Sequence, residues 1–232
     1  MVENYGGVYI YKHVDYEQPK EHFKFAATII EKAVTGKKDV SILDVGCAKG
    51  ELLYYLKSRF DDKSLYLCGV DFSETLIEVA TNFKGLQGVD FYNDDAETFK
   101  IEKKFDVIMS SGLLGFFDDS TAFLDNILSH LKPGGMICLT SSFSTSNYDV
   151  IVKYRHYGDK TLESGWNQHC IEGIKLFMSE RGKMVKAHKF NLPFELHKTE
   201  DVLRSWTINT SEGQNFTCGL NLIWNVWCLE IQ

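Results

Sequence analysis

The sequence has few prolines and no long apolar run. Three of its 232 residues are proline, which leaves little room for a disordered linker between domains. No apolar stretch reaches the roughly 18 residues of a membrane-spanning helix. The opening residues MVENYGG lack the basic and then apolar regions of a secretory signal. We therefore expect one soluble domain over residues 1–232 that stays in the cytoplasm and does not insert into a membrane.

An excess of positive charge is also absent. Lys and Arg number 25 against 32 Asp and Glu, for a net charge of -7. A broad basic surface that neutralises nucleic-acid phosphates is therefore not expected. We predict a small-molecule acceptor, no nucleic-acid partner, and a monomer or homodimer.

The cysteines lack the spacing of a metal or redox site. None falls in a C-x-x-C or zinc-like pattern, and several lie in apolar, strand-like runs. We expect buried, reduced thiols and no metal at the six positions Cys47, Cys68, Cys138, Cys170, Cys218 and Cys228.

The most informative stretch is SILDVGCAKG, residues 41–50. Residues 42–45 are mostly branched and apolar, as in a strand buried on both faces of a parallel sheet. Gly46 and Gly50 bracket a turn, and helical spacing follows with Leu52, Leu53, Leu56 and Phe60 on one face. A strand, a glycine turn and a helix form the first half of a βαβ nucleotide fold, whose ligand lies at the carboxyl end of the strand.

The spacing of the glycines indicates which nucleotide cofactor the loop binds. The dinucleotide pattern G-x-G-x-x-G is missing, which argues against a nicotinamide-dependent oxidoreductase. The run DVGCAKG, residues 44–50, resembles motif I of the class I S-adenosylmethionine (SAM) dependent methyltransferases, usually D-x-G-x-G-x-G. Ala48 replaces the middle glycine and narrows the room above the loop.

A second strand, residues 64–71, ends in Asp71, which comes 21 residues after Gly50. A carboxylate at this distance suits two ribose hydroxyls, since it accepts both hydrogen bonds. The alternative is a cap for the following helix, residues 74–83, but Ser73 is better placed for that role. We predict Asp71 as the ribose ligand.

A third strand, residues 89–92, leads into an acidic turn. In the methyltransferases that this chain resembles, an Asp and a small residue at this turn meet the adenine, and Asp95 and Ala96 match. Asp94 directly precedes Asp95, so Asp94 could take the adenine-binding position instead. A solvated acidic turn is the other interpretation.

Two later landmarks support the resemblance. A fourth strand, residues 105–111, is not followed by an N-P-P-Y type tetrapeptide, which disfavours methylation of bases or glutamine. The run LKPGG, residues 131–135, and a strand at 136–142 resemble the turn and fifth strand of the same family. The resemblance implies SAM as cofactor, with S-adenosylhomocysteine (SAH) as product, bound by Asp44, Gly46, Cys47, Gly50, Asp71, Phe72, Asp95, Ala96 and Ser111.

The implied fold is α/β: a doubly wound seven-stranded, mostly parallel sheet with an antiparallel last strand and helices on both faces. We expect an N-terminal lid and helix over residues 1–40, with the lid at residues 5–14 and the helix from Pro19. The SAM-binding core covers 41–142 and an acceptor-specificity extension with C-terminal strands covers 143–232. Within the extension we expect a helix at 171–180, strands at 184–190 and 220–231, and a hairpin around 209–216.

The connection at residues 143–170 is long, and such connections inside compact domains are usually functional. Histidine is the natural general base near neutral pH, so we take His156, then His169, with Tyr154, as catalytic candidates. An arginine fork suits a phosphate or carboxylate. The predicted acceptor-binding residues are Arg155, Tyr157, Trp166, Asn167 and Arg204. A surface or structural role is the alternative for each histidine and arginine.

The pattern also bears a faint resemblance to methyltransferases of bacterial surface-polysaccharide pathways, carried by Tyr154-Arg155, the run ESGWN at 163–167 and LRSW at 203–206. It suggests O-methylation of a sugar, a sugar phosphate or a related capsule or glycan precursor. A small-molecule N-methyltransferase and a non-catalytic binding protein of the same fold stay open as alternatives.

Overall fold

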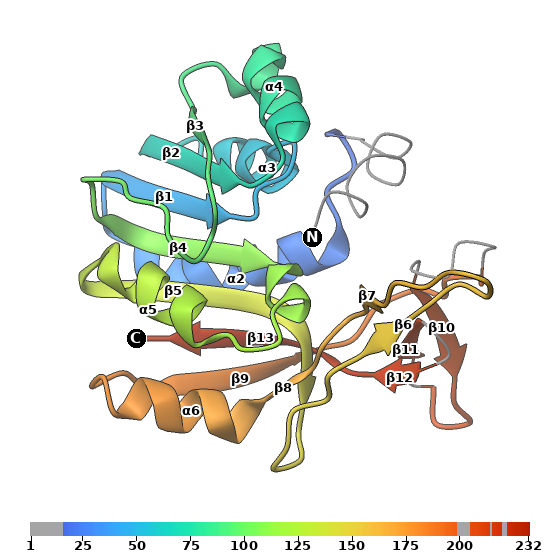
Figure 1. Ribbon diagram of the computed structural model, residues 1–232. Helices are drawn as coiled ribbons and strands as arrows, with labels where there is room; N and C mark the ends of the chain where they lie inside the picture. Colours follow the sequence, from blue (N-terminus) through green and yellow to red (C-terminus); the bar gives the residue numbers. More distant parts are fainter. Residues whose placement is uncertain (1–15, 199–204, 214, 220–221) are drawn as a thin grey trace. The chain divides into compact units, whose positions relative to one another are not determined.

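The computed structural model describes residues 16–198, 205–213, 215–219 and 222–232. The chain divides into two compact units, one formed by Met1–Ser111 with Thr121–Cys138 and the other by Gly112–Ser120 with Leu139–Gln232. Among the described residues the main sheet has eight strands in the order β3-β2-β1-β4-β5-β13-β9, with β8 paired to β5 (Figure 1). The predicted lid at residues 5–14 and Arg204 lie outside the described residues. The single domain stays a prediction.

The first unit contains the parallel strands β1 (Asp39–Val45), β2 (Ser64–Asp71), β3 (Asp90–Asn93) and β4 (Phe105–Ser111). The register pairs Val45 with Val70 and Asp71 with Asn93, so the strands end along one edge of the sheet. β1 is buried from its second residue to its end, as an apolar run covered on both faces should be. The predicted strand at 105–111 is confirmed at both ends.

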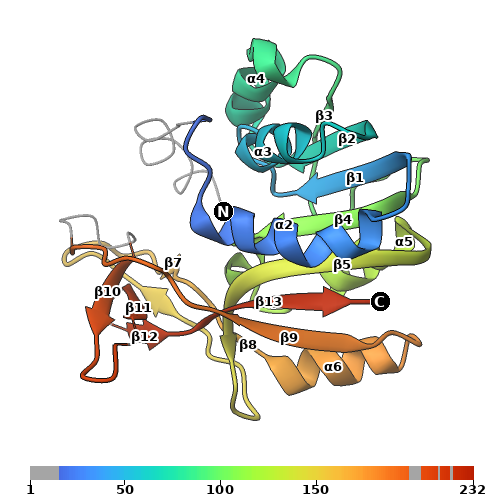
Figure 2. The same cartoon turned by 180° about the vertical axis from the view of Figure 1, so that it is seen from behind.

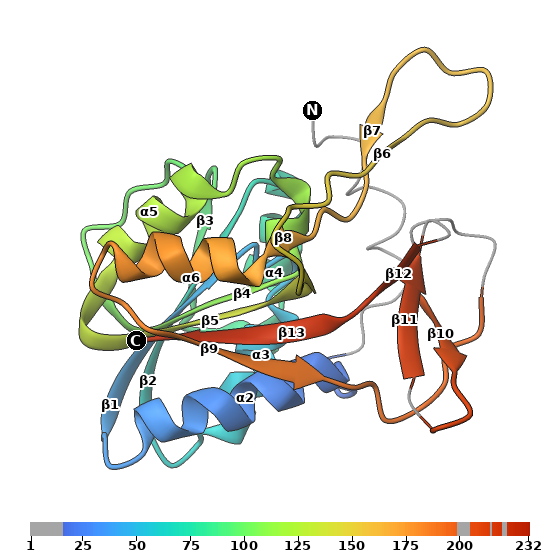
Figure 3. The same ribbon diagram turned by 90° about the horizontal axis from the view of Figure 1, so that it is seen from below.

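Within the described residues, four helices accompany these strands: α2 (Glu21–Val34), α3 (Glu51–Arg59), α4 (Glu74–Asn82) and α5 (Thr121–Ser129). Each buries one apolar stripe. In α2, which confirms the helix expected after Pro19, the buried residues include Phe23, Ala26, Ala27, Ile30 and Val34. Helix α2 covers one face of the strands and α5 the opposite face, as Figures 2 and 3 show. The short 3-10 turns η2 (Lys84–Leu86) and η3 (Leu113–Phe116) complete the connections.

One half-buried carboxylate, that of Asp106, organises the amino-terminal end of these strands. The Asp106 carboxylate accepts hydrogen bonds from Lys132 at 2.7 Å, from Lys37 at 3.0 Å, and from the Ser41 backbone N–H and hydroxyl at 3.0 and 2.8 Å. Burial alone would raise the pKa of Asp106, but these hydrogen bonds hold it well below its ordinary value. The charge of Asp106 at this end of the sheet is therefore balanced by the two lysines, and the cluster has a structural role.

The second unit holds the end of β5 (Leu131–Ser144), the helix α6 (Ile171–Ser179) and the strands β9 (Val185–Phe190) and β13 (Val226–Ile231). β13 runs antiparallel to β9, which confirms the antiparallel last strand. A separate small sheet joins β10 (Trp206–Asn209), β11 (Asn215–Gly219) and β12 (Leu222–Trp224). The pairs β6 (Lys153–Tyr154) with β7 (Glu163–Ser164), and β8 (His169–Cys170) with β5, belong to the long connection.

Two predicted strands differ from the structure by more than one residue, whereas the strands predicted at 89–92 and 184–190 are shifted or shortened by one. Strand β5 begins at Leu131, so it includes the run predicted as a turn, although Gly134 keeps a φ of 71° that favours glycine. The last predicted strand is two strands, β12 and β13, separated at Asn225. The Asn225 carbonyl there accepts a hydrogen bond from the Phe143 N–H at 3.3 Å. Asn225 itself therefore belongs to neither strand.

None of the described helices is long and apolar enough to cross a membrane. None of the six cysteines forms a disulfide, and all six are buried, as expected from their scattered positions. No cluster of metal-ligating side chains occurs within the part of the chain that the structure describes.

Candidate active site

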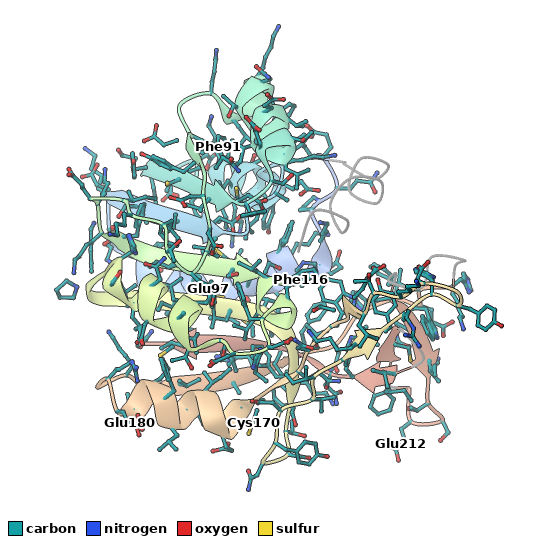
Figure 4. All side chains as sticks on the ribbon, in the orientation of Figure 1. Phe91, Glu97, Phe116, Cys170, Glu180 and Glu212 are labelled. Carbon is teal, nitrogen blue, oxygen red and sulfur yellow. The ribbon has the colours of Figure 1, made fainter. Side chains whose placement is uncertain are left out.

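The glycine loop after β1 is held against the end of β2. The backbone N–H groups of Gly46 and Cys47 both donate to the Val70 carbonyl, at 2.8 and 3.0 Å. Gly46 and Gly50 have φ of 79° and 78°, values that a side chain disfavours. A Cβ on Gly50 would also lie 2.7 Å from Leu86 Cδ1 and 3.1 Å from Phe91 Cζ; Phe91 is labelled on β3 in Figure 4. The loop therefore requires glycine at these corners.

Asp71 connects this loop to the next helix. Its Oδ2 accepts from the Ala48 N–H at 2.8 Å, and its Oδ1 accepts from the Ser73 N–H at 2.9 Å. Burial raises the pKa of the Asp71 carboxyl, and the two backbone hydrogen bonds partly offset that effect. A carboxylate has about four acceptor sites, so these bonds leave room for ribose hydroxyls. The ribose role stays a prediction.

Ser73 occupies the N-cap position of α4, as predicted, but its side chain makes no capping hydrogen bond. The Asp71 carboxylate receives the Ser73 N–H instead. Asp71 thus fixes both the glycine loop and the start of α4. The two interpretations of Asp71, ligand and helix-end acceptor, are compatible.

Asp44 and Ser110 provide buried polar atoms without a protein partner. Asp44 is 2% exposed and Ser110 3% exposed, and neither the Asp44 Oδ1 nor the Ser110 Oγ has a hydrogen-bond partner among the described residues. Burial first, and then the negative charges of Asp71 and Glu51, raise the pKa of Asp44 to about 8. A cationic ligand with hydrogen-bond donors fits this surplus of acceptors, and SAM carries both a sulfonium and an ammonium group.

The remaining predicted cofactor residues lie at the same edge or just beyond it. Phe72 follows Asp71 and is 56% exposed, an unusual position for a large apolar ring. The Asp95 Oδ1 accepts from the Glu97 N–H at 2.8 Å, and the Ala96 carbonyl accepts from Asn126 at 3.1 Å. These bonds fix the acidic turn but do not test its contact with adenine. The half-buried Ser111 ends β4, while its neighbour Ser110, which sequence reasoning passed over, carries the unpartnered hydroxyl.

The raised pKa of Asp44 predicts a pH-dependent affinity for SAM. In the free protein Asp44 keeps its proton up to about pH 8, whereas a cationic ligand favours the ionised form. Binding must therefore release a proton below that pH, so affinity should increase with pH, by at most about tenfold per unit, and level off above the pKa. Calorimetric titration with SAM between about pH 6 and 9 measures this slope.

The control for this prediction is Asp44→Asn. It removes the carboxyl titration but leaves that of the cofactor's own amino group, so the difference between the two curves belongs to Asp44. If the wild-type and Asp44→Asn curves have the same slope, Asp44 does not face the cofactor.

The predicted acceptor residues of the second unit divide into two groups. Arg155, His156 and Tyr157 are exposed and line an open hollow of about 490 Å³ together with Gly158, Asp159 and Lys160. Tyr154 is half-buried; its hydroxyl donates to Glu163 Oε2 at 2.8 Å, and its ring meets the His156 ring edge-on at 5.8 Å. The segment between β6 and β7 thus places Arg155, Lys160 and the His156 ring around one hollow, together with the Asp159 carboxylate.

The second group is built into the scaffold. Asn167 is fully buried: its Oδ1 accepts from the Val152 N–H at 2.8 Å, and its Nδ2 donates to the Phe117 carbonyl at 2.8 Å and to Asp118 Oδ1 at 3.0 Å. The Trp166 ring packs at 5.1 Å from that of Phe116, which is labelled in Figure 4. These contacts favour a structural role for Asn167 and Trp166, although acceptor binding is not tested by them.

His169 is also buried in this group. Its Nε2 lies 3.2 Å from the Leu114 carbonyl and 3.1 Å from the Phe117 carbonyl. Both partners are acceptors only, so this nitrogen carries the hydrogen. Nε2 is therefore not the nitrogen that would take a proton, and the role of His169 as a base stays a prediction.

Known proteins match the chain in sequence and in fold. Residues 36–216 match the model of a methyltransferase domain family. Malonyl-[acyl-carrier protein] O-methyltransferase 2 of Ilyobacter polytropus is 25% identical over 165 residues, which are 71% of this chain and 62% of that protein. The chain therefore spans less than two thirds of that relative's length.

Two solved structures show the same fold. The YcgJ protein of Bacillus subtilis has a TM-score of 0.59 at 14% identity, covering 91% of this chain and 97% of that one. A DhpI–SAH complex has a TM-score of 0.59 at 13% identity, covering 100% and 90%. The family match shows that the chain belongs to a methyltransferase domain family, and the two structures show that it has the class I methyltransferase fold.

Proposed function

We propose that this enzyme methylates an oxygen atom of a small anionic acceptor, with sugar phosphates and related capsule or glycan precursors as the first candidates. The hollow lined by Arg155, His156 and Lys160, which together outnumber the one carboxylate of Asp159 there, carries this proposal. The protein as a whole is acidic, so local cations with one histidine suit one anionic group better than a charged polymer. We also propose a cytoplasmic location, where the free thiols stay reduced.

The proposed roles of Arg155 and His156 follow from the chemistry of methyl transfer. Bound SAM supplies an electrophilic methyl group on its sulfonium sulfur. Arg155 holds the acceptor's phosphate or carboxylate, and His156 takes the hydroxyl proton as the new C–O bond forms and the S–C bond breaks to leave SAH. Alignment supplies roughly 7 to 11 kcal/mol of such a displacement, and a positioned base adds about 10² to 10⁴-fold.

A second candidate is O-methylation of a carboxylate on an acyl group. Malonyl-[acyl-carrier protein] O-methyltransferases among the relatives favour it. A carboxylate is already ionised near neutral pH, so it needs no general base, and the buried His169 is engaged with two carbonyls. The two candidates therefore differ in their need for His156.

The test measures SAH formation with matched acceptors: sugar phosphates, the same sugars without phosphate, acyl carboxylates including a malonyl thioester, and small amines. We expect turnover with phosphorylated sugars. Arg155→Ala should raise KM for them about tenfold or more, and His156→Gln should lower kcat about 10²-fold or more with SAH binding unchanged. The control is Lys175→Ala on α6, an exposed cation paired with Glu172.

Each other outcome assigns a different acceptor. Turnover of acyl carboxylates with full activity in His156→Gln would establish the second candidate and overturn the first. Turnover confined to amines would make the enzyme an N-methyltransferase.

A further inference from the structure

Residues 16–20, here termed the strap, are fastened to the cofactor loop and the helix that follows it. The Tyr16 hydroxyl donates to the Lys49 carbonyl at 2.8 Å, and its ring stacks on Phe83 with centroids 3.8 Å apart and planes 5° apart. The Tyr54 hydroxyl donates to Glu17 Oε1 at 2.9 Å. Lys20 lies 3.6 Å from Glu51 at the start of α3. All these residues belong to the first unit.

The strap contacts the part of the glycine loop, Ala48 and Lys49, where the backbone is strained. Ala48 is the one described non-glycine residue with positive φ, at 48°, a conformation that costs free energy for a residue with a Cβ. Such strain persists only where surrounding groups over-determine it. Asp71 holds the Ala48 N–H on one side, and Tyr16 holds the Lys49 carbonyl on the other.

We propose that Tyr16 is a positioning residue for SAM: by holding the Ala48–Lys49 corner, it keeps Asp71 and the loop in the cofactor-binding arrangement. Tyr16 and SAM then stabilise the same loop conformation, so docking of the strap and binding of the cofactor are coupled in both directions. Burial and the neighbouring Glu51 raise the pKa of Tyr16 to about 12, so its hydroxyl remains a donor throughout the physiological range. The inference does not depend on the acceptor.

The test is Tyr16→Phe, which removes the hydroxyl and keeps the stacked ring. Affinity for SAH, measured by calorimetry with no acceptor present, should fall about two- to tenfold, the worth of one hydrogen bond. Tyr66→Phe is the matched control, because it removes a hydroxyl that donates to Asp90 at 2.6 Å on the surface of the same unit. KM for SAM should rise in Tyr16→Phe while kcat changes little.

A second variant separates positioning from general stability. Ala48→Gly in the Tyr16→Phe background relieves the strain that Tyr16 opposes, and should recover most of the lost affinity. Unchanged SAH affinity in Tyr16→Phe, or a loss that Ala48→Gly leaves in place, would overturn the proposal. Failure to find an acceptor would leave this result intact, since the readout is binding of SAH alone.

Discussion

Replacing Asp71 by alanine is expected to weaken SAM binding at least tenfold. The side chain accepts from the backbone N–H groups of Ala48 and Ser73, and by our proposal from the ribose hydroxyls. Loss of charge-assisted hydrogen bonds costs about 1.5 to 3 kcal/mol. The loop conformation and the ribose contact are lost together, so the effect should be larger than that of Tyr16→Phe.

Calorimetric titration with SAH measures this loss, and Asp90→Ala is its matched control. Asp90 begins the neighbouring strand β3 and bonds only to the Tyr66 hydroxyl among the contacts of its carboxylate that the structure describes. Affinity should be unchanged in Asp90→Ala. Asp71→Asn should be intermediate, because an amide oxygen still accepts one backbone hydrogen bond. An affinity for SAH that survives Asp71→Ala would remove Asp71 from the site.

Replacing Asn167 by alanine is expected to destabilise the protein by about 2 to 4 kcal/mol. The substitution leaves the half-buried Val152 N–H without its acceptor and takes one donor from the Phe117 carbonyl, which keeps the contact with His169. It also removes one hydrogen bond to Asp118, the carboxylate that pairs with Lys153 at 2.7 Å. The hairpin that carries Arg155 and His156 should therefore loosen, and acceptor turnover should fall with it.

Chemical denaturation gives the free energy of unfolding for this variant. Asn209→Ala provides the comparison, because Asn209 is exposed and donates to Glu195 at 2.8 Å; a change below about 0.5 kcal/mol is expected there. A stable Asn167→Ala variant with a raised KM for the acceptor would contradict the structural role and restore Asn167 as an acceptor ligand.

The buried strands β2 and β4 were predictable to both ends because the signal is local. The apolar run of β4 fixes both its ends, and the spacing from Gly50 places Asp71 at the end of β2. Parallel pairing then brings Asp44 and Asp71 to the same edge of the sheet. No knowledge of partners distant in sequence is needed for these steps.

Roles set by distant partners were not predictable. Asn167 and His169 look like site residues by type, but their partners lie at positions 114–118, about 50 residues earlier. Likewise, apolar alternation continues across Asn225, so only the contact with Phe143 reveals that the strand is interrupted there. The role of Tyr16 depends on Lys49 in the same way.

The most direct test of the account is one calorimetric experiment in which SAH and a nicotinamide dinucleotide are titrated separately into the same protein. The glycine loop, the two acids at the strand ends and the unpartnered Asp44 oxygen predict saturable binding of one SAH per chain and no binding of the dinucleotide. Saturable binding of the dinucleotide with none of SAH would contradict the assignment of the cofactor site.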